Sequence, residues 1–243
     1  MAPRSVIASS ARILTNARPT PIRRAVNRSV GGRMKLLGMC AQQYDYSSAE
    51  EAWADDHIAA RVIRALTANG NIERVLDAGC GNGNLSARIA AQGFAVSAFD
   101  ASTSGVEHAQ RAFPSVHFRV ASAYDDLREQ FDDVFDACVC VEVIEHLYDP
   151  RTFVSRVCEV LRPGGLFVVS TPYHGYLKNL ALAITGGTDN HYSALWDGGH
   201  IKFWSRSTLT TLLQEHGFQV IRFEGAGRVP LLWKSMIVTA QRS

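Results

Sequence analysis

Residues 75–83 read VLDAGCGNG, a short apolar run that meets an acid and then has glycine at every second position. The apolar residues predict a buried strand over 74–78, and the pattern of 85–92 predicts a helix directly after the glycines. Glycine adopts positive φ at low cost and lets a ligand approach the backbone closely. The first N–H groups of a helix have no partner within the helix and can bind an electron-rich ligand. The stretch therefore predicts a strand–turn–helix unit with a ligand site at its turn.

The same alternation of apolar runs and helical patterns continues to the C-terminus. Further strands are expected at 94–99, 117–121, 135–143, 166–170, 218–223 and 235–240. Helices are expected at 44–68, 103–112, 150–161 and after Ser205, the last one closed by Gly217. Strands separated by helices form mostly parallel sheets that are covered on both faces. We therefore predict an α/β fold with a doubly wound, mostly parallel, seven-stranded sheet.

The composition is that of a globular domain, with 47% hydrophobic and 20% charged residues. The charge is uneven: residues 1–44 carry seven Arg, one Lys and no acid, whereas the rest carries 17 basic and 23 acidic groups. An acidic body argues against nucleic acid as a partner. The acid-free start is consistent with a mitochondrial targeting peptide, a disordered tail or an over-long start. The cytoplasm is the expected location, with the mitochondrion as the alternative. Residues 1–44 are set apart from a domain over 45–243.

Asp100 closes the strand that follows the glycines, 21 residues after Gly79. An acid at this place accepts hydrogen bonds from two ribose hydroxyls. The third glycine of dinucleotide-binding enzymes is replaced here by Asn84, which counts against NAD. The GxGxG turn with Asp77 and Asp100 instead resembles motif I of class I S-adenosylmethionine (SAM) methyltransferases. ASAY at 121–124, FDA at 135–137, EVIEH at 142–146 and LRPGG at 161–165 extend the resemblance over roughly 70–240.

The resemblance implies the Rossmann-like fold of that class and SAM as cofactor. It places Gly79 and Gly81 against the methionine part and Asp100 on the ribose. The full set of cofactor-binding residues that it implies is Arg61, Asp77, Gly79, Gly81, Gly83, Asp100, Ala101, Ser122, Ala123 and Val141. Within the set, Arg61 would pair with the SAM carboxylate, Ala101 would lie beside the adenine, and Val141 would close the pocket.

The EVIEH segment is most similar to the ubiquinone biosynthesis O-methyltransferases, which methylate a hydroxyl of a polyprenylated catechol or quinol. That resemblance implies a divalent cation, Mg²⁺ or another, on Glu142, Glu145 and His146. If the segment is helical, positions i, i+3 and i+4 share one face and such a set can form. In the alternative, the acids only favour the start of a helix and His146 acts as a general base.

Residues 172–205 depart from the quinone enzymes and predict an insert that covers the acceptor. His200 follows two glycines and joins Glu145 and His146 as a candidate catalytic residue. An apolar stripe of Leu177, Leu180, Ala181 and Ile184 favours either a lid helix packed on the core or peripheral contact with a membrane.

We therefore expect methyl transfer from SAM to a hydroxyl of a phenolic or quinol-type small molecule. The alternatives are another soluble acceptor, methylated on O or N, and a SAM-binding regulatory protein without turnover. The oligomeric state is left open.

Overall fold

A computed structural model describes residues 56–192, 195–196, 199–227 and 229–243. The basic segment 1–44 and the start of the helix predicted at 44–68 lie outside these residues. The elements in chain order are α1 (Asp56–Thr67), β1 (Arg74–Ala78), α2 (Asn84–Ala90), β2 (Ala95–Asp100), α3 (Thr103–Ala112), β3 (His117–Val120), α4 (Leu127–Gln130), β4 (Phe135–Val141), the 3₁₀ helix η1 (Ile144–His146), α5 (Pro150–Val160), β5 (Leu161–Pro172), α6 (Tyr176–Thr185), α7 (Thr188–Tyr192), α8 (Arg206–Glu215), β6 (Phe218–Ala226) and β7 (Ser235–Arg242).

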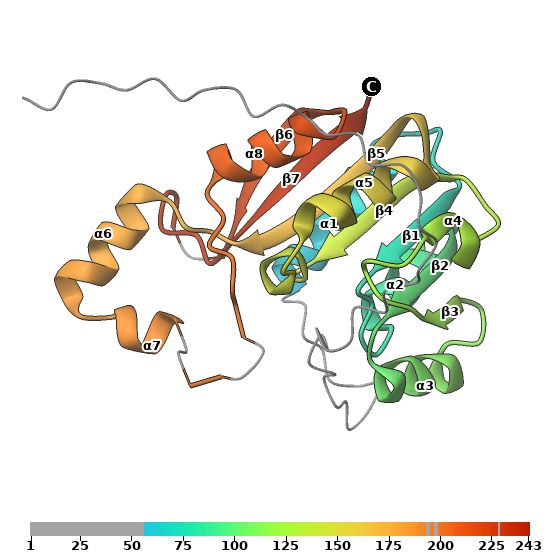
Figure 1. Cartoon of the computed structure of the whole chain (residues 1–243), viewed down its shortest axis with the longest axis horizontal. Coiled ribbons are helices and arrows are strands. Elements are labelled where there is room, and N and C mark those ends of the chain that lie inside the picture. The colour runs from blue at the N-terminus through green and yellow to red at the C-terminus, as the bar shows by residue number, and fades with distance from the viewer. Residues whose placement is uncertain (1–55, 193–194, 197–198, 228) are drawn as a thin grey trace, which may run out of the picture. The chain divides into compact units, whose positions relative to one another are not determined.

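The seven strands form one sheet in the order β3-β2-β1-β4-β5-β7-β6 (Figure 1). The first five in this order are parallel to one another, and β7 runs antiparallel to both β5 and β6. The chain moves outward from β1 to β3 and then returns to the centre at β4. A cleft forms where the strand order reverses in this way, outside the carboxyl ends of the strands. The predicted doubly wound, mostly parallel, seven-stranded sheet is confirmed.

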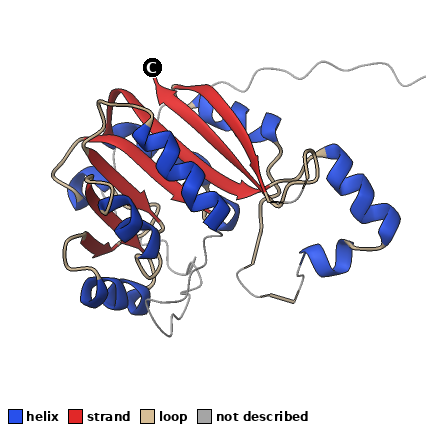
Figure 2. Cartoon of the chain, turned by 180° about the vertical axis from the view of Figure 1, so that it is seen from behind, coloured by secondary structure: helices blue, strands red, loops and turns tan. Residues whose placement is uncertain are grey.

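Helices cover both faces of the sheet (Figure 2). Alternate residues of a strand point to opposite faces, and the buried residues accordingly form two clusters. One cluster joins Leu76 and Cys138 to side chains of α5 and α8, and the other joins Val75 and Val139 to side chains of α1, α2 and α3. The central strands are thus apolar on both sides, as a covered parallel sheet requires.

Local sequence signals fix several element ends. Ser205 caps α8 through a reciprocal pair of hydrogen bonds with Thr208, and Gly217 follows the helix with φ of 81°. Two features were not predicted. The short helix α4 begins after Asp126, whose side chain accepts a hydrogen bond from the Arg128 N–H. Residues 163–165 precede the strand predicted at 166–170, yet they lie within β5, where the pairing with β4 changes register.

The insert between β5 and α8 contains α6 and α7, set apart from the sheet in Figure 1. The predicted apolar stripe lies on α6, but Leu177, Leu180 and Ile184 are 48%, 41% and 76% exposed. The prediction that this stripe packs on the core is therefore wrong for the described residues. The buried residue of α6 is instead Lys178. No helix in the described part of the chain combines the length and the apolar character that a membrane span needs.

Asp136 ties the start of β1 to β4 and β5. Its carboxylate accepts the backbone N–H groups of Glu73 and Arg74, each at 2.9 Å, and Nε of Arg162 at 2.6 Å. We expect Asp136→Ala to lower the free energy of unfolding by about 1–3 kcal/mol, because three donors lose their acceptor. Urea titration measures this. The exposed Asp132→Ala is the control, and an equal loss in both variants would contradict this role.

Candidate functional site

A cavity of about 470 Å³ lies at the carboxyl ends of β1, β2 and β4. The strand order reverses at this edge of the sheet, where ligands of open α/β sheets bind. The predicted site residues that line the cavity are Asp77, Gly79, Gly81, Asp100, Ala101, Ser122, Ala123, Val141, Glu142, His146 and His200. The structure thus gathers most of the predicted set around one space.

The glycine turn is left-handed at Gly79, Gly81 and Gly83, with φ of 83°, 53° and 80°. A Cβ on Gly79 would lie 2.4 Å from Cγ2 of Val143, so only glycine fits there. Gly83 has another role than predicted. It is not among the cavity-lining residues, and a Cβ there would lie 2.7 Å from Ala109 and Phe118. Its small size therefore serves close packing of the turn on α3 and β3.

Asp100 faces the cavity with a carboxylate held by the backbone. Its two oxygens accept the N–H groups of Gly81 and Ser102, each at 2.8 Å. Burial raises the pKa of this carboxyl, and these backbone hydrogen bonds oppose the rise. Each carboxylate oxygen has a second lone pair. The fixed carboxylate can therefore still accept hydrogen bonds from two neighbouring hydroxyls.

Asp77 lies at the end of β1 beneath the glycine turn and is almost fully buried. Its carboxylate accepts a hydrogen bond from the Ser86 hydroxyl at 2.6 Å. Burial raises the pKa of Asp77 to about 7, the Ser86 hydrogen bond opposes the rise, and the nearby Asp100 charge adds to it. A cationic ligand in the cavity would favour the ionised form of Asp77.

Arg61 does not reach the cavity. Its guanidinium donates to the carbonyl of His57 at 2.7 Å on the same helix, and it is not among the described lining residues. The structure therefore does not support the predicted pairing of Arg61 with a ligand carboxylate.

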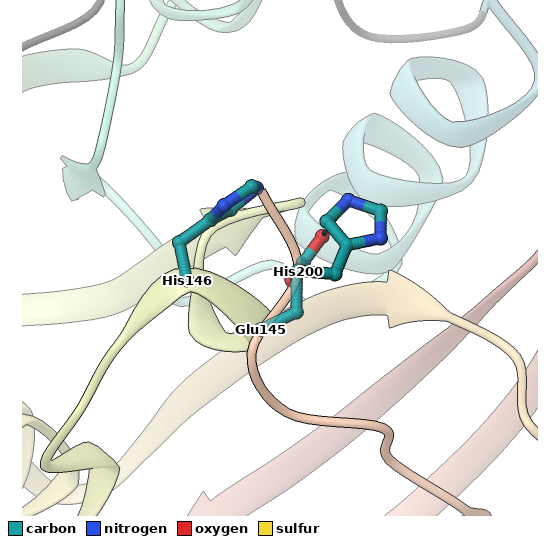
Figure 3. A group of neighbouring side chains, drawn as sticks. All are labelled: Glu145, His146 and His200. Atoms are coloured by element: carbon teal, nitrogen blue, oxygen red, sulfur yellow. Dashed lines mark ion pairs between the residues drawn. The ribbon is translucent and has the colours of Figure 1, made fainter. Parts of the chain in front are cut away.

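A second group of polar side chains consists of Glu145, His146 and His200 (Figure 3), of which the two histidines line the cavity. Ligand atoms of the three lie within 4.8 Å of one another. The Glu145 carboxylate is 3.9 Å from Nε2 of His200, and the two imidazole rings are 4.9 Å apart. Glu145 is fully buried behind the histidines and does not itself line the cavity.

Residues 199–204 return from the insert and are fixed to η1 by hydrogen bonds. The backbone carbonyl of Glu145 accepts the N–H groups of both Ile201 and Lys202 at 3.0 Å, which seats His200 beside His146. Nδ1 of His146 donates to the carbonyl of Gly199 at 3.2 Å. Because a carbonyl only accepts, this bond requires the proton on Nδ1 and leaves Nε2 as the acceptor atom of the neutral ring.

Glu142 is not part of this group. The segment does not begin a helix at Glu142, because η1 starts only at Ile144 and Glu142 has a left-handed backbone with φ of 54°. Its carboxylate accepts the hydroxyls of Ser170 and Ser235 instead. The predicted shared helical face of Glu142, Glu145 and His146 is therefore not formed, and His200 takes the third place.

Burial sets the charges of this group. It raises the pKa of Glu145 well above its usual range, and the Glu142 charge adds to the rise. Burial, with smaller contributions from His146, His191 and Lys178, lowers the pKa of His200 to about 4. Among the described residues, neither Glu145 oxygen makes a hydrogen bond of ordinary geometry, and a weaker interaction with the Thr171 side chain opposes the rise in the pKa of Glu145. One carboxylate and two imidazoles fit a divalent transition metal better than Mg²⁺, which prefers oxygen ligands.

Sequence reasoning missed two contributions. The ring of Trp196 lies 5.7 Å from that of His146 and 5.5 Å from that of His200, and so completes an aromatic wall. The sequence alone does not separate Trp196 from residues that only pack the insert. The Tyr124 hydroxyl accepts the N–H groups of Tyr148 and Asp149 at 2.9 and 3.3 Å and so holds the cavity wall. No sequence signal indicates either contact.

Comparison with known proteins agrees with this geometry. Residues 51–222 match the methyltransferase domain family. The chain belongs to this family. The ubiquinone biosynthesis O-methyltransferase of Caulobacter sp. (strain K31) is 39% identical over 117 residues, 46% of each chain. A protein of the same name from Colwellia psychrerythraea is 30% identical over 182 residues, covering 72% of this chain and 73% of that protein.

This methyltransferase domain spans about half the length of the Caulobacter relative that it matches. Among solved structures, magnesium protoporphyrin IX methyltransferase from Synechocystis PCC 6803 with bound SAH has a TM-score of 0.59 and 23% identity. That match covers 76% of this chain and 82% of the Synechocystis chain. The likeness shows that the two share their fold.

The lowered pKa of His200 links stability to pH. Between the ordinary value near 6.5 and the folded value of about 4, the unfolded chain binds more protons than the folded one. The free energy of unfolding should therefore fall as the pH drops through this window, and His200→Gln should remove about 1–2 kcal/mol of that fall. Urea titrations at pH 7 and pH 4.5 measure it. The exposed His117→Gln is the control, and an unchanged pH dependence in His200→Gln would contradict the assignment.

Proposed function

We propose that this protein transfers the methyl group of SAM to a hydroxyl oxygen of a phenolic or quinol-type small molecule. The observation that carries the proposal is one cavity that joins the glycine turn and Asp100 at one end to His146, His200 and Trp196 at the other. A methyl donor and its acceptor must occupy adjoining sites for direct transfer. The Caulobacter and Colwellia relatives are both named ubiquinone biosynthesis O-methyltransferase, which supports oxygen as the methylated atom.

The proposed SAM-binding end of the cavity contains the Asp77 and Asp100 carboxylates and the glycine turn. Asp100 accepts the two ribose hydroxyls on its remaining lone pairs, and Ala101, Ser122 and Ala123 line the place of the adenine. The methionine part lies along Gly79 and Gly81, where the absent Cβ atoms leave the backbone exposed. SAM carries a sulfonium and an ammonium, so the buried Asp77 offers the complementary charge.

The proposed acceptor-binding end of the cavity contains aromatic rings. Trp196, His146 and His200 give a flat acceptor an aromatic wall. Nε2 of His146 takes the hydroxyl proton while the oxygen attacks the methyl carbon in line with the sulfur. The new O–C bond forms as the S–C bond breaks, S-adenosylhomocysteine (SAH) leaves, and the proton stays on the imidazole. Formation of the imidazolium favours the ionised form of Glu145, which has a ligand atom within 4.8 Å of the His146 ring, and the carboxylate then stabilises the positive charge.

A divalent cation is a second way to activate the acceptor. Glu145, His146 and His200 would hold it, and Glu142 would not. When bound, the ion lowers the pKa of a coordinated hydroxyl. The buried Glu145 carboxylate supports this reading, because the described part of the chain gives it no hydrogen bond of ordinary geometry.

The acceptor can be lipid-linked or soluble. The exposed apolar side chains of α6 and α7, among them Tyr176, Leu177 and Ile184, support peripheral contact with a lipid surface. A soluble acceptor would leave this surface without a role in catalysis, and a regulatory SAM-binding protein would show no turnover.

The ribose assignment predicts the effect of Asp100→Asn. The amide keeps the shape but replaces one acceptor oxygen by a donor, so both SAM and SAH should bind about 10–100-fold more weakly. Isothermal titration with SAH measures this. Asp132→Asn is the control, and equal SAH affinity in the native protein and Asp100→Asn would refute the cofactor site.

The transfer itself is tested with methyl-labelled SAM and a cell extract separated into lipid and aqueous fractions. His146→Gln should reduce label transfer about 100-fold or more while SAH affinity stays within about threefold, because the ring lies at the acceptor end. His117→Gln is the matched control. Full transfer by His146→Gln would exclude it as the base.

The distribution of the label separates the remaining readings. Label in the lipid fraction supports a lipid-linked phenol or quinol, and label in the aqueous fraction a soluble acceptor. Loss of label on chelation supports the divalent cation. SAH binding without any transfer in complete extract would favour the regulatory alternative.

A further inference from the structure

Glu142 occupies an unusual place at the end of β4. Its backbone is left-handed, with φ of 54°, a conformation that Glu142 shares with only one other non-glycine residue of the described chain, Leu231. Side chains other than glycine adopt this region rarely, and it persists only where the surrounding contacts hold it. The contacts that hold Glu142 come from two other strands.

The Glu142 carboxylate is bound by one serine on each side. The Ser170 hydroxyl on β5 donates to Oε1 at 2.8 Å, and the Ser235 hydroxyl on β7 donates to Oε2 at 3.2 Å. The Glu142 N–H is itself bonded to Ser170 at 3.2 Å. Both serines are buried, so no solvent can replace the carboxylate as the acceptor of their hydroxyl groups.

The insert is bonded to the residue that precedes Ser235. Lys178, the buried residue of α6, donates from Nζ to the Lys234 carbonyl at 3.4 Å. The base of α6 is thus linked through Lys234 to Ser235, whose hydroxyl binds the Glu142 carboxylate. Although burial raises the pKa of Glu142, the two serine hydrogen bonds and the charges of Lys234 and Lys178 favour its ionised form.

On its other side, Glu142 leads directly into Val143. The Val143 side chain lies so close to Gly79 that a Cβ there would be 2.4 Å from Cγ2. The left-handed backbone of Glu142 sets the direction in which Val143 leaves β4. Any change at Glu142 therefore reaches the glycine turn through this contact.

We propose that Glu142 is a positioning residue that couples the base of the acceptor insert to the glycine turn, and that it is not a metal ligand. The inference rests on the proposed function, because it takes the turn as the SAM site. Its two carboxylate oxygens serve Ser170 and Ser235, while the metal-capable group forms without it.

The test compares Glu142→Gln and Glu142→Gly in the full chain by titration with SAH. The glutamine keeps an oxygen and a nitrogen for two hydroxyls, which can each donate or accept, so its SAH affinity should stay within about threefold of native. The glycine keeps the backbone conformation but loses both serine contacts, so Val143 is no longer fixed. We expect it to bind SAH about tenfold more weakly.

Leu231→Gly is the matched control, because it also removes a side chain from a left-handed residue, at a position that does not line the cavity. The double variant Ser170→Ala/Ser235→Ala should reproduce the loss, and adding Glu142→Gly to it should cause little further change. A Glu142→Gly protein with a lowered melting temperature and native SAH affinity would show a merely structural role and overturn the proposal. Failure of the native chain to bind SAH would instead refute the proposed function.

Titration with Zn²⁺ tests the second half of the proposal. Glu145→Gln should lose zinc affinity, whereas Glu142→Gln should keep the native value. A larger loss of zinc affinity in Glu142→Gln than in Glu145→Gln would make Glu142 a ligand and overturn the inference. An equal zinc affinity in Glu142→Gln and the native chain, including no binding by either, agrees with it.

Discussion

The parallel pairing of β1 with β2 on one side and β4 on the other is the constraint on which the site depends. Parallel strands end at the same edge, so the residues that follow them meet whatever their distance in sequence. The pairing with β2 even extends into the turn, because the N–H groups of Gly79 and Cys80 both bond to the Phe99 carbonyl. Asp100 follows Phe99 directly and is thereby brought against the glycines.

The sequence predicts this part of the molecule well because its signals are local. A buried parallel strand is apolar on both faces, a tight turn needs glycine, and Ser205 predicts the start of a helix. Each of these signals can be recognised within a few residues of sequence. The strands and their mostly parallel arrangement follow from such patterns, whereas most of the predicted residues that line the cavity come from the resemblance to class I methyltransferases. The register change between β4 and β5 does not, because it arises from how two distant segments pair.

The acceptor end is less predictable for the same reason. Whether Glu142 or His200 joins Glu145 and His146 depends on where η1 begins and on the path of residues 199–204 back from the insert. Helical spacing alone suggests a shared face for Glu142, Glu145 and His146. Buried hydroxyls on two other strands draw Glu142 away from that face, and neither serine stands near it in sequence. The predicted role of Arg61 is not supported for a similar reason, because its guanidinium bonds to the His57 carbonyl on the same helix.

The insert is fastened at both of its ends. His174 bonds through its N–H to the Trp204 carbonyl, and Ile201 and Lys202 bond to the Glu145 carbonyl. His200 is therefore held by bonds made outside the two helices of the insert. Substitutions of the exposed apolar side chains of α6 can change the surface that the insert presents, while these bonds keep the position of His200.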